Sequence, residues 1–322
     1  MASPQLPRLG LGCAPLGNLG TVFTDDEAGE ILEAAWEVGV RHFDTAPHYG
    51  LGLSEERLGR FLATKPRDEF VVSTKVGRLL RDNHDWDGVS LDDNIFRVPG
   101  RLTRVLDYSA EGVRASAEES LTRLGLDRID VLYVHDPEQA TEGATESAMA
   151  GLAELRDEGL VRQVGTGSLS VDSLLRAVRT GLADVVMAAN CYTLLKQTVA
   201  PDLLAACEEH GTRIVAAAVF NSGVLSSTPS KASTFDYAAV PDDVLDRARA
   251  IDSVCRSYDV ELAAAAIQYP LLDRRVSSVM VGAAAADQVR QNAARLDVPI
   301  PDQLWTELDK RGLVPQVVAP CA

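Results

Sequence analysis

Short apolar runs alternate with amphipathic helical patterns along the whole chain. Each run is strand-sized and almost continuously apolar, which is typical of parallel strands that are covered on both faces. The predicted strands are residues 9–13, 40–44, 69–75, 129–135, 162–167, 184–190, 213–220 and 277–283.

Segments with helical periodicity lie between the predicted strands. The first begins with Thr24 as N-cap, places Glu27 in the capping-box position and ends at Gly39. The predicted helices are residues 24–39, 54–63, 109–125, 144–159, 171–181, 201–211, 241–259, 261–273 and 286–296.

Eight strand–helix alternations without a break in composition predict a (β/α)8 TIM barrel, with residues 1–322 as a single domain. A doubly wound sheet is the alternative, but the GxGxxG turn that usually follows its first strand is missing. Two connections, 77–108 and 221–240, are too long for ordinary βα loops. We expect them to lack secondary structure and to overhang the C-terminal face of the barrel as functional loops.

Composition restricts the class of partner. The 322 residues are 46% hydrophobic, and 31 Lys and Arg against 47 Asp and Glu give a net charge of −16. This charge disfavours nucleic acid or an anionic membrane as a partner. The five cysteines show no metal-site spacing, and no secretory signal or membrane-spanning run is present. We expect a cytoplasmic protein, monomeric or a small homo-oligomer, with no metal.

Four ionisable side chains lie at or just beyond the ends of apolar runs: Asp44, Tyr49, Lys75 and His135. The C-terminal ends of parallel barrel strands converge, so these side chains should meet there. A Tyr, with a reference pKa of about 10, is a poor acid or base at neutral pH, but a nearby Lys favours the tyrosinate. An Asp would keep that Lys charged, and a His can orient a substrate oxygen. The set predicts a proton relay at a carbonyl or hydroxyl carbon, which needs a separate electron acceptor.

Three stretches, DTAPHYG (44–50), STK (73–75) and VLYVHDP (131–137), resemble the aldo-keto reductase family, and the likeness extends from about residue 8 to 296. The resemblance implies that Tyr49 is the proton donor or acceptor, tuned by Lys75 and Asp44. Tyr49 and His135 would contact the substrate. The implied reaction moves a hydride to or from a nicotinamide bound without a Rossmann fold.

Aromatic residues of the 77–108 connection are further candidates. Trp86 is a predicted substrate contact, and Phe96 and Tyr108 are possible pocket residues with it. The alternative is that all three only hold the loop against the barrel rim.

The resemblance also implies cofactor contacts. Ser168 and Asn190 would hold the carboxamide with shorter side chains than the family's usual Asn and Gln, and Phe220 would stack on the nicotinamide. The other implied contacts are Asp44 near the nicotinamide, Asn221, Ser222, Gly223 and Leu225 around the pyrophosphate, and Gly282, Ala284, Gln288 and Asn292 at the adenosine end.

One departure from the family pattern bears on cofactor choice. Members that prefer NADPH usually carry a Lys or Arg just after the last strand, whereas this chain has AAAAD at 283–287. Arg290 is the nearest cation, and Asp287 would repel a phosphate. We predict a preference for NAD over NADP.

Within the family, KVGRLLR (75–81), CYTLL (191–195) and FNSGVL (220–225) resemble the branch of L-fucose or D-threo-aldose 1-dehydrogenases and pyridoxal dehydrogenases. That branch implies oxidation of an anomeric hydroxyl to a lactone, with Tyr49 as general base.

Three alternatives remain open at this stage. The first is an NADPH-dependent aldehyde or ketone reductase on the same scaffold, and the second is a cofactor-sensing binding subunit. The third is a metal-dependent barrel hydrolase, which the histidine pattern disfavours because it has no HxH pair. The histidines are residues 42, 48, 84, 135 and 210.

Overall fold

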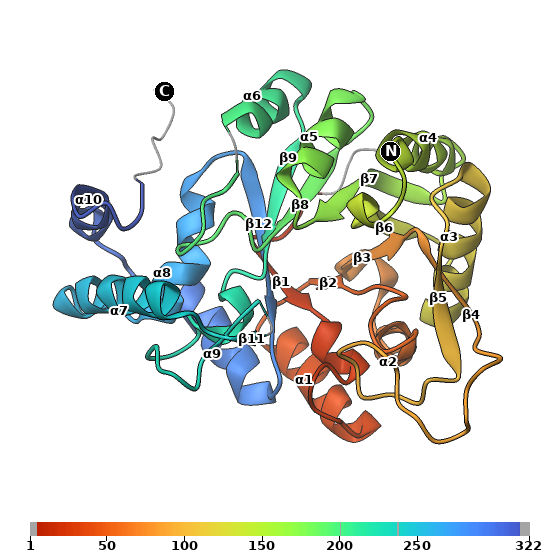
Figure 1. Cartoon of the computed structure of the whole chain (residues 1–322), viewed down its shortest axis with the longest axis horizontal. Coiled ribbons are helices and arrows are strands. Elements are labelled where there is room, and N and C mark those ends of the chain that lie inside the picture. The colour runs from red at the N-terminus through yellow and green to blue at the C-terminus, as the bar shows by residue number, and fades with distance from the viewer. Residues whose placement is uncertain (1–4, 200, 237, 316–322) are drawn as a thin grey trace.

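Eight strands pair in parallel and close into a barrel in the computed structural model, which describes residues 5–199, 201–236 and 238–315 (Figure 1). Neighbours in the barrel follow one another along the chain, and the last strand pairs with the first. The predicted (β/α)8 fold is therefore confirmed. The barrel strands are β1 Leu9–Gly12, β2 His42–Asp44, β3 Val71–Val76, β6 Ile129–His135, β7 Val161–Ser168, β8 Val185–Ala189, β9 Arg213–Ala217 and β12 Val276–Gly282.

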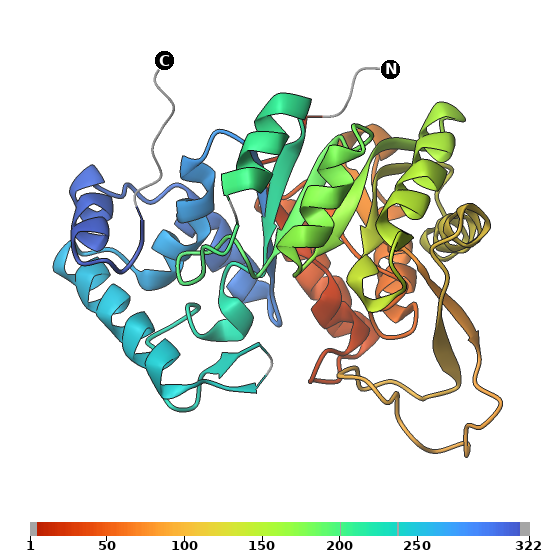
Figure 2. The ribbon, with the colours of Figure 1, turned by 45° about the horizontal axis from the view of Figure 1, so that its top comes forward.

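Helices surround the barrel (Figures 1 and 2). The predicted capping box is present at the first of them: Thr24 Oγ1 accepts a hydrogen bond from the Glu27 amide at 3.2 Å, and the Glu27 carboxylate accepts one from the Thr24 amide at 2.7 Å. The helices are α1 Asp25–Glu37, α2 Leu53–Leu62, α3 Ala110–Leu124, α4 Ala144–Asp157, α5 Val171–Arg179, α6 Pro201–His210, α7 Asp242–Ser257, α8 Leu262–Gln268, α9 Ala286–Leu296 and α10 Asp302–Lys310. Within the described residues, no helix is long and apolar enough to cross a membrane.

Alternating side chains of each strand serve two separate cores. In β6, Val131 and Tyr133 belong to a buried cluster made almost entirely of barrel strands, so they fill the interior. Leu132 and Val134 belong to the larger cluster that includes the surrounding helices. This period-two division explains why the strands are apolar on both faces.

The expectation that the two long connections lack secondary structure is wrong. The first contains an antiparallel hairpin of β4 Arg78–Asp82 and β5 Leu102–Leu106, which carries the loop 83–101 (Figure 2). The second contains the short pair β10 Thr234–Phe235 and β11 Ala238–Ala239. Most of β5 faces solvent and so lacks the apolar run by which the barrel strands were recognised.

Two predicted elements also end clearly earlier than expected, and one helix was not predicted. β9 ends at Ala217 because Ala218 has a left-handed φ of 54°, so Phe220 lies beyond the strand. α8 ends before Pro270, whose ring cannot continue the hydrogen-bond ladder. α10 was not predicted; its buried Leu304 and Leu308 pack against α7, a partner that the local pattern does not reveal.

Candidate active site

A buried ion pair lies at the C-terminal ends of β2 and β3. Lys75 Nζ donates to Asp44 Oδ2 at 2.7 Å and to the Thr45 carbonyl at 2.8 Å, and the Ser73 hydroxyl donates to Asp44 Oδ1 at 2.8 Å. Asp44 and Lys75 are only 3% and 2% exposed. Burial alone would lower the pKa of Lys75, but the charges of Asp44 and Tyr49 outweigh it and raise that pKa. Lys75 is therefore positively charged, and its hydrogen bonds hold the ammonium group in place.

Tyr49 lies in the loop between β2 and α2, beside this cation. The Nζ atom of Lys75 is 4.7 Å from the centroid of the Tyr49 ring. The backbone of the loop packs directly on the turn at Gly17, because a Cβ atom added there would come within 2.5 Å of the Tyr49 carbonyl carbon. The position of Tyr49 thus depends on the absence of a side chain at Gly17.

We expect Gly17→Ala to lower both stability and activity. The new methyl group must displace the Tyr49–Gly50 peptide, since backbone atoms and not a flexible side chain occupy its place. Such overpacking costs about 1–3 kcal/mol, and a displaced catalytic group costs on the order of tenfold or more in kcat. Urea unfolding and steady-state kinetics would measure the two effects.

Gly29→Ala is the matched control for this change. Gly29 lies within α1 and a Cβ atom there would meet open space, so Ala should stabilise the helix by about 0.5–1 kcal/mol. Its kcat should remain that of the parent. A Gly17→Ala variant with the parent kcat would show that the packing of this turn does not position Tyr49.

His135 ends β6 and faces Tyr49. The two ring centroids are 6.0 Å apart, at a nearly perpendicular angle. Burial, together with the positive charges of Arg78 and Lys75, holds the pKa of His135 well below its usual range. The imidazole is therefore neutral, and it can share a hydrogen bond with a substrate oxygen without carrying the transferred proton.

Tyr108 supports the end of this strand. Its hydroxyl donates to the carbonyl oxygens of His135 at 2.7 Å and of Asp136 at 3.2 Å. Burial raises the pKa of Tyr108 to about 12, so the hydroxyl stays protonated and remains a donor. These hydrogen bonds show that Tyr108 holds its loop against the barrel rim, and a place in a substrate pocket stays a prediction.

A polar cluster next to His135 was not predicted. Arg78 donates to Asp136 Oδ2 at 2.7 Å and to Gln139 Oε1 at 3.1 Å, and its Nη1 lies 3.3 Å from His48 Nδ1. Because a guanidinium only donates, His48 Nδ1 accepts and the ring proton is on Nε2. The rings of His48 and His135 are 5.6 Å apart. Arg78 thus joins Asp136, Gln139 and His48 through hydrogen bonds beside His135, and only the folded chain brings them together.

The 83–101 loop delivers an aromatic residue to the site. Phe96 is buried, and its ring lies 6.0 Å from that of Tyr49 and 5.2 Å from that of His48. Trp86 lies on the same loop, where its indole N–H donates to the Ser90 carbonyl at 2.9 Å. Phe96, named only as a possible pocket residue, is thus the aromatic side chain of this loop that packs on Tyr49.

A groove of about 760 Å³ opens beside Asp44 at the C-terminal ends of the strands. Its wall includes Gln291 and Arg295, which sequence reasoning did not single out. The predicted cofactor contacts that line it are Asp44, Phe220, Ser222, Gly223, Gly282, Ala284, Gln288 and Asn292.

The loop after β9 forms one side of the groove. Asn221, Ser222 and Gly223 have successive left-handed φ angles of 48°, 62° and 118°. The amide N–H groups of Asn221 and Gly223 donate to the carbonyls of Ala218 at 2.8 Å and of Phe220 at 3.0 Å, which holds the turn in this shape. Ser222 and Gly223 of this turn line the groove with small side chains, which leaves room there for the pyrophosphate of a dinucleotide.

Four predicted cofactor contacts do not line the groove. Ser168 donates to Glu138 Oε1 at 2.7 Å, and the side-chain amide of Asn221 donates to that of Asn190. Asn221 and Leu225 are fully buried. Contact of Ser168 and Asn190 with a carboxamide stays a prediction, and it requires these side chains to exchange their present partners.

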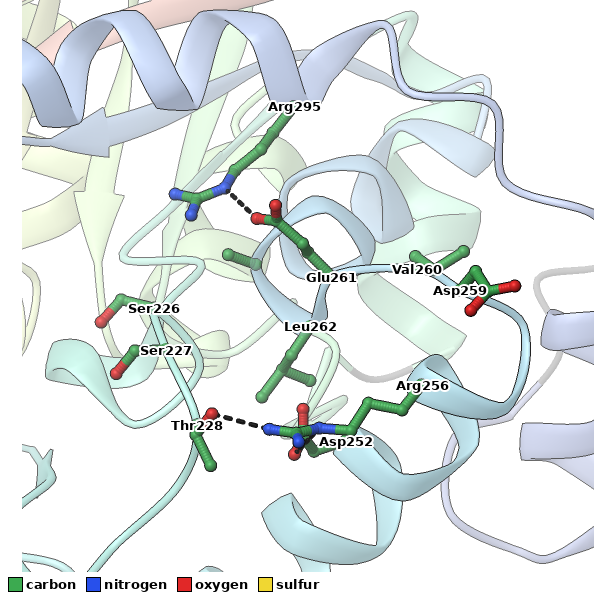
Figure 3. A pocket seen from close by; sticks show the side chains of 11 residues that line it. Ser226, Ser227, Thr228, Asp252, Arg256, Asp259, Val260, Glu261, Leu262 and Arg295 are labelled. Carbon is green, nitrogen blue, oxygen red and sulfur yellow. Dashed lines mark hydrogen bonds and ion pairs between the residues drawn. The ribbon is translucent and has the colours of Figure 1, made fainter.

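The two cations of α9, Arg290 and Arg295, are already paired. Arg295 lies between the groove and a neighbouring cavity of about 610 Å³, and its Nε donates to Glu261 Oε2 at 2.9 Å (Figure 3). Arg290 lies 3.1 Å from Glu37 and 3.2 Å from Asp287. Both guanidinium groups therefore face carboxylates.

In the part of the chain that the structure describes, no group of three or more His, Cys, Asp or Glu side chains is arranged to hold a metal ion. The cluster of Asp44, Lys75, Tyr49 and His135 lies at the C-terminal ends of the strands, beside the groove that Asp44 lines.

A parallel barrel with this cluster at its C-terminal face defines a barrel enzyme of the oxidoreductase class. The chain belongs to the aldo/keto reductase family, whose model matches residues 8–312. It is therefore an NAD(P)-dependent oxidoreductase, and the predicted family and enzyme class are confirmed.

Two named relatives align with almost the whole chain. It is 52% identical to D-threo-aldose 1-dehydrogenase of a Pseudomonas species over 317 residues, covering 98% of this chain and 96% of the relative. It is 36% identical to pyridoxal 4-dehydrogenase of Microbacterium luteolum, with 95% and 94% covered. Both relatives belong to the branch that the sequence motifs resemble.

Solved structures support the fold. A glycerol dehydrogenase from Gluconobacter oxydans has a TM-score of 0.74 at 23% identity and covers 98% of this chain and 95% of its own. An aldo-keto reductase from Bacillus halodurans has a TM-score of 0.75 at 23% identity, with 97% and 94% covered.

Proposed function

We propose that this chain is an aldose 1-dehydrogenase, which oxidises the anomeric hydroxyl of a cyclic sugar to a lactone. The observation that carries the proposal is the 52% identity to D-threo-aldose 1-dehydrogenase across nearly the whole chain. The polar cluster of His48, Arg78 and Asp136 beside His135 supports it, because a sugar offers hydroxyl groups to such partners. Trp86 is proposed as a further substrate contact on the loop that carries Phe96.

The proposed mechanism removes one hydrogen from the anomeric hydroxyl oxygen, as a proton, and the other from the anomeric carbon, as a hydride. Tyr49, as tyrosinate, takes the hydroxyl proton as general base, and the ammonium group of Lys75 stabilises the negative charge on the phenolate. Asp44 keeps Lys75 charged and in place. Neutral His135 orients the substrate oxygen. A bound nicotinamide would supply the hydride acceptor, and the sugar would lose two electrons and two hydrogens in all.

The test is the absorbance of reduced nicotinamide at mildly alkaline pH, with L-fucose, D-arabinose, L-galactose, L-xylose, D-glucose and pyridoxal as substrates. We expect turnover of at least one aldose. Turnover of pyridoxal alone would contradict the sugar assignment. An inactive panel, with NADPH consumed by simple aldehydes, would assign the chain to the reductases instead.

We further propose NAD as the preferred cofactor. The 2′-phosphate of NADP requires a free cation, whereas Arg290 and Arg295 are each paired with carboxylates. The amide N–H of Ala284 donates to Gln288 Oε1 at 2.8 Å, and the turn 284–288 carries the Asp287 carboxylate but no cation. We expect kcat/KM to be higher for NAD⁺ than for NADP⁺. A KM ratio that favours NADP⁺ by about tenfold, or 1.4 kcal/mol, would contradict this preference.

We also propose a cytoplasmic enzyme. The four cysteines within the described residues, Cys13, Cys191, Cys207 and Cys255, are free and buried, as expected in a reducing compartment. Size-exclusion chromatography would distinguish a monomer from a small homo-oligomer.

A further inference from the structure

We infer that Glu261 discriminates between the two cofactors, because it neutralises the one cation among the described residues that line the groove. This inference deepens the proposed NAD preference and rests on the groove as the cofactor site. Glu261 itself does not line the groove; it lines the adjoining cavity, and Arg295 lines both (Figure 3). Its effect on a cofactor would therefore be exerted through Arg295.

Arg295 is held at the groove wall from two sides. Its Nη1 donates to Asn292 Oδ1 at 3.1 Å, and Asn292, one turn earlier on α9, lines the same groove. Its Nε donates to Glu261 at the start of α8. The Arg295 side chain is 19% exposed and that of Glu261 is 69% exposed. The cation is thus positioned by the groove, while its neutralising charge comes from the outer surface.

This arrangement acts differently on the two cofactors. A 2′-phosphate adds about two negative charges, and arginine is well suited to pair with it. With Glu261 present, the guanidinium is already engaged, and the carboxylate adds its own repulsion. The 2′-hydroxyl of NAD carries no charge, so the Glu261 carboxylate weakens its binding little. Ser226 and Ser227, which with Arg295 form the wall shared by the two cavities, offer only neutral groups.

The other cation of α9 cannot take over this role while its own pairs are intact. Arg290 lies between Glu37 and Asp287 and is absent from the groove lining. Substitution of Glu261 should also cost little stability. Its side chain makes no cap hydrogen bond at the start of α8, and an exposed ion pair contributes little to the free energy of unfolding.

The test is the Glu261→Gln variant of the full chain. We expect the ratio of kcat/KM for NADP⁺ to that for NAD⁺ to rise about 5- to 30-fold, the range of a single charge-assisted contact to phosphate. Isothermal titration calorimetry should show tighter binding of 2′,5′-ADP with a much smaller change for 5′-AMP. The second readout needs no sugar turnover, so it separates this inference from the proposed substrate.

Two further variants sharpen the test. Glu146→Gln removes another exposed carboxylate that pairs with an arginine, Arg176 at 2.8 Å, on α4 far along the chain from the groove. It should leave the kcat/KM ratio and the affinities for 2′,5′-ADP and 5′-AMP unchanged. Combining Glu261→Gln with Arg295→Gln should abolish the gain. A Glu261→Gln variant with the parent ratios, or a gain that survives the loss of Arg295, would overturn the inference.

Discussion

Tyr49→Phe is expected to lower kcat by roughly 10³- to 10⁴-fold and to leave the Kd for the nicotinamide nucleotide almost unchanged. The substitution removes the phenolic oxygen that would take the proton, while the ring that packs on Phe96 and lies beside Lys75 remains. Tyr49 does not line the groove, so cofactor binding loses no contact. Aldose oxidation and fluorescence titration with the nucleotide would measure the two constants.

Tyr108→Phe is the control for the loss of a phenolic oxygen near the site. That hydroxyl donates to the carbonyls at the end of β6, so its removal costs about one hydrogen bond, or on the order of 1 kcal/mol. We expect less than a tenfold effect on kcat. A Tyr49→Phe variant with near-parental kcat would remove Tyr49 from the mechanism, whatever the result for Tyr108.

The fold and the four central residues were predictable because the information is local. Strands buried on both faces leave continuous apolar runs, and a charge at the end of such a run, as at Lys75 or His135, has no structural reason to be there. Chain order then equals strand order in a (β/α)8 barrel, which brings the strand ends together. The observed Lys75–Asp44 pair follows from that topology.

The polar cluster beside His135 was not predictable because its contacts are distant in sequence. Arg78 lies 58 positions from Asp136 and 30 from His48. The local sequence around each of the three residues gives no sign of the other two. Phe96 reaches Tyr49 only through a hairpin whose outer strand is mostly exposed. Likewise, the Arg295–Glu261 pair joins separate helices, 34 positions apart.

The groove was predictable in part. Backbone-level features, such as the small residues Gly223 and Gly282, follow from the motif and line the groove as expected. Side-chain contacts were harder to predict from sequence. An amide or hydroxyl group that contacts the cofactor in the family can instead form a hydrogen bond with a neighbouring protein group. Ser168 and Asn190 illustrate this second case, since both are engaged by protein groups.

Lys75→Met is expected to damage both chemistry and stability. It removes the cation that stabilises the tyrosinate, and we expect kcat to fall by roughly 10²- to 10⁴-fold. It also leaves Asp44 buried with only the Ser73 hydroxyl among the side-chain donors described above. An uncompensated buried charge costs about 3–5 kcal/mol in the free energy of unfolding. Urea denaturation at neutral pH and single-turnover kinetics would measure the two losses.

Two comparisons separate these losses. Adding Asp44→Asn to Lys75→Met removes the stranded charge, so most of the stability should return while kcat stays low. Arg123→Met strands a different buried carboxylate, that of Glu55, which is 0% exposed and lies 2.6 Å from Arg123 Nε. It should destabilise the fold to a similar degree but leave kcat of the folded enzyme near that of the parent. If the double variant regained activity with its stability, Lys75 would act only as a structural partner of Asp44, and the positive charge beside Tyr49 would have no part in proton transfer.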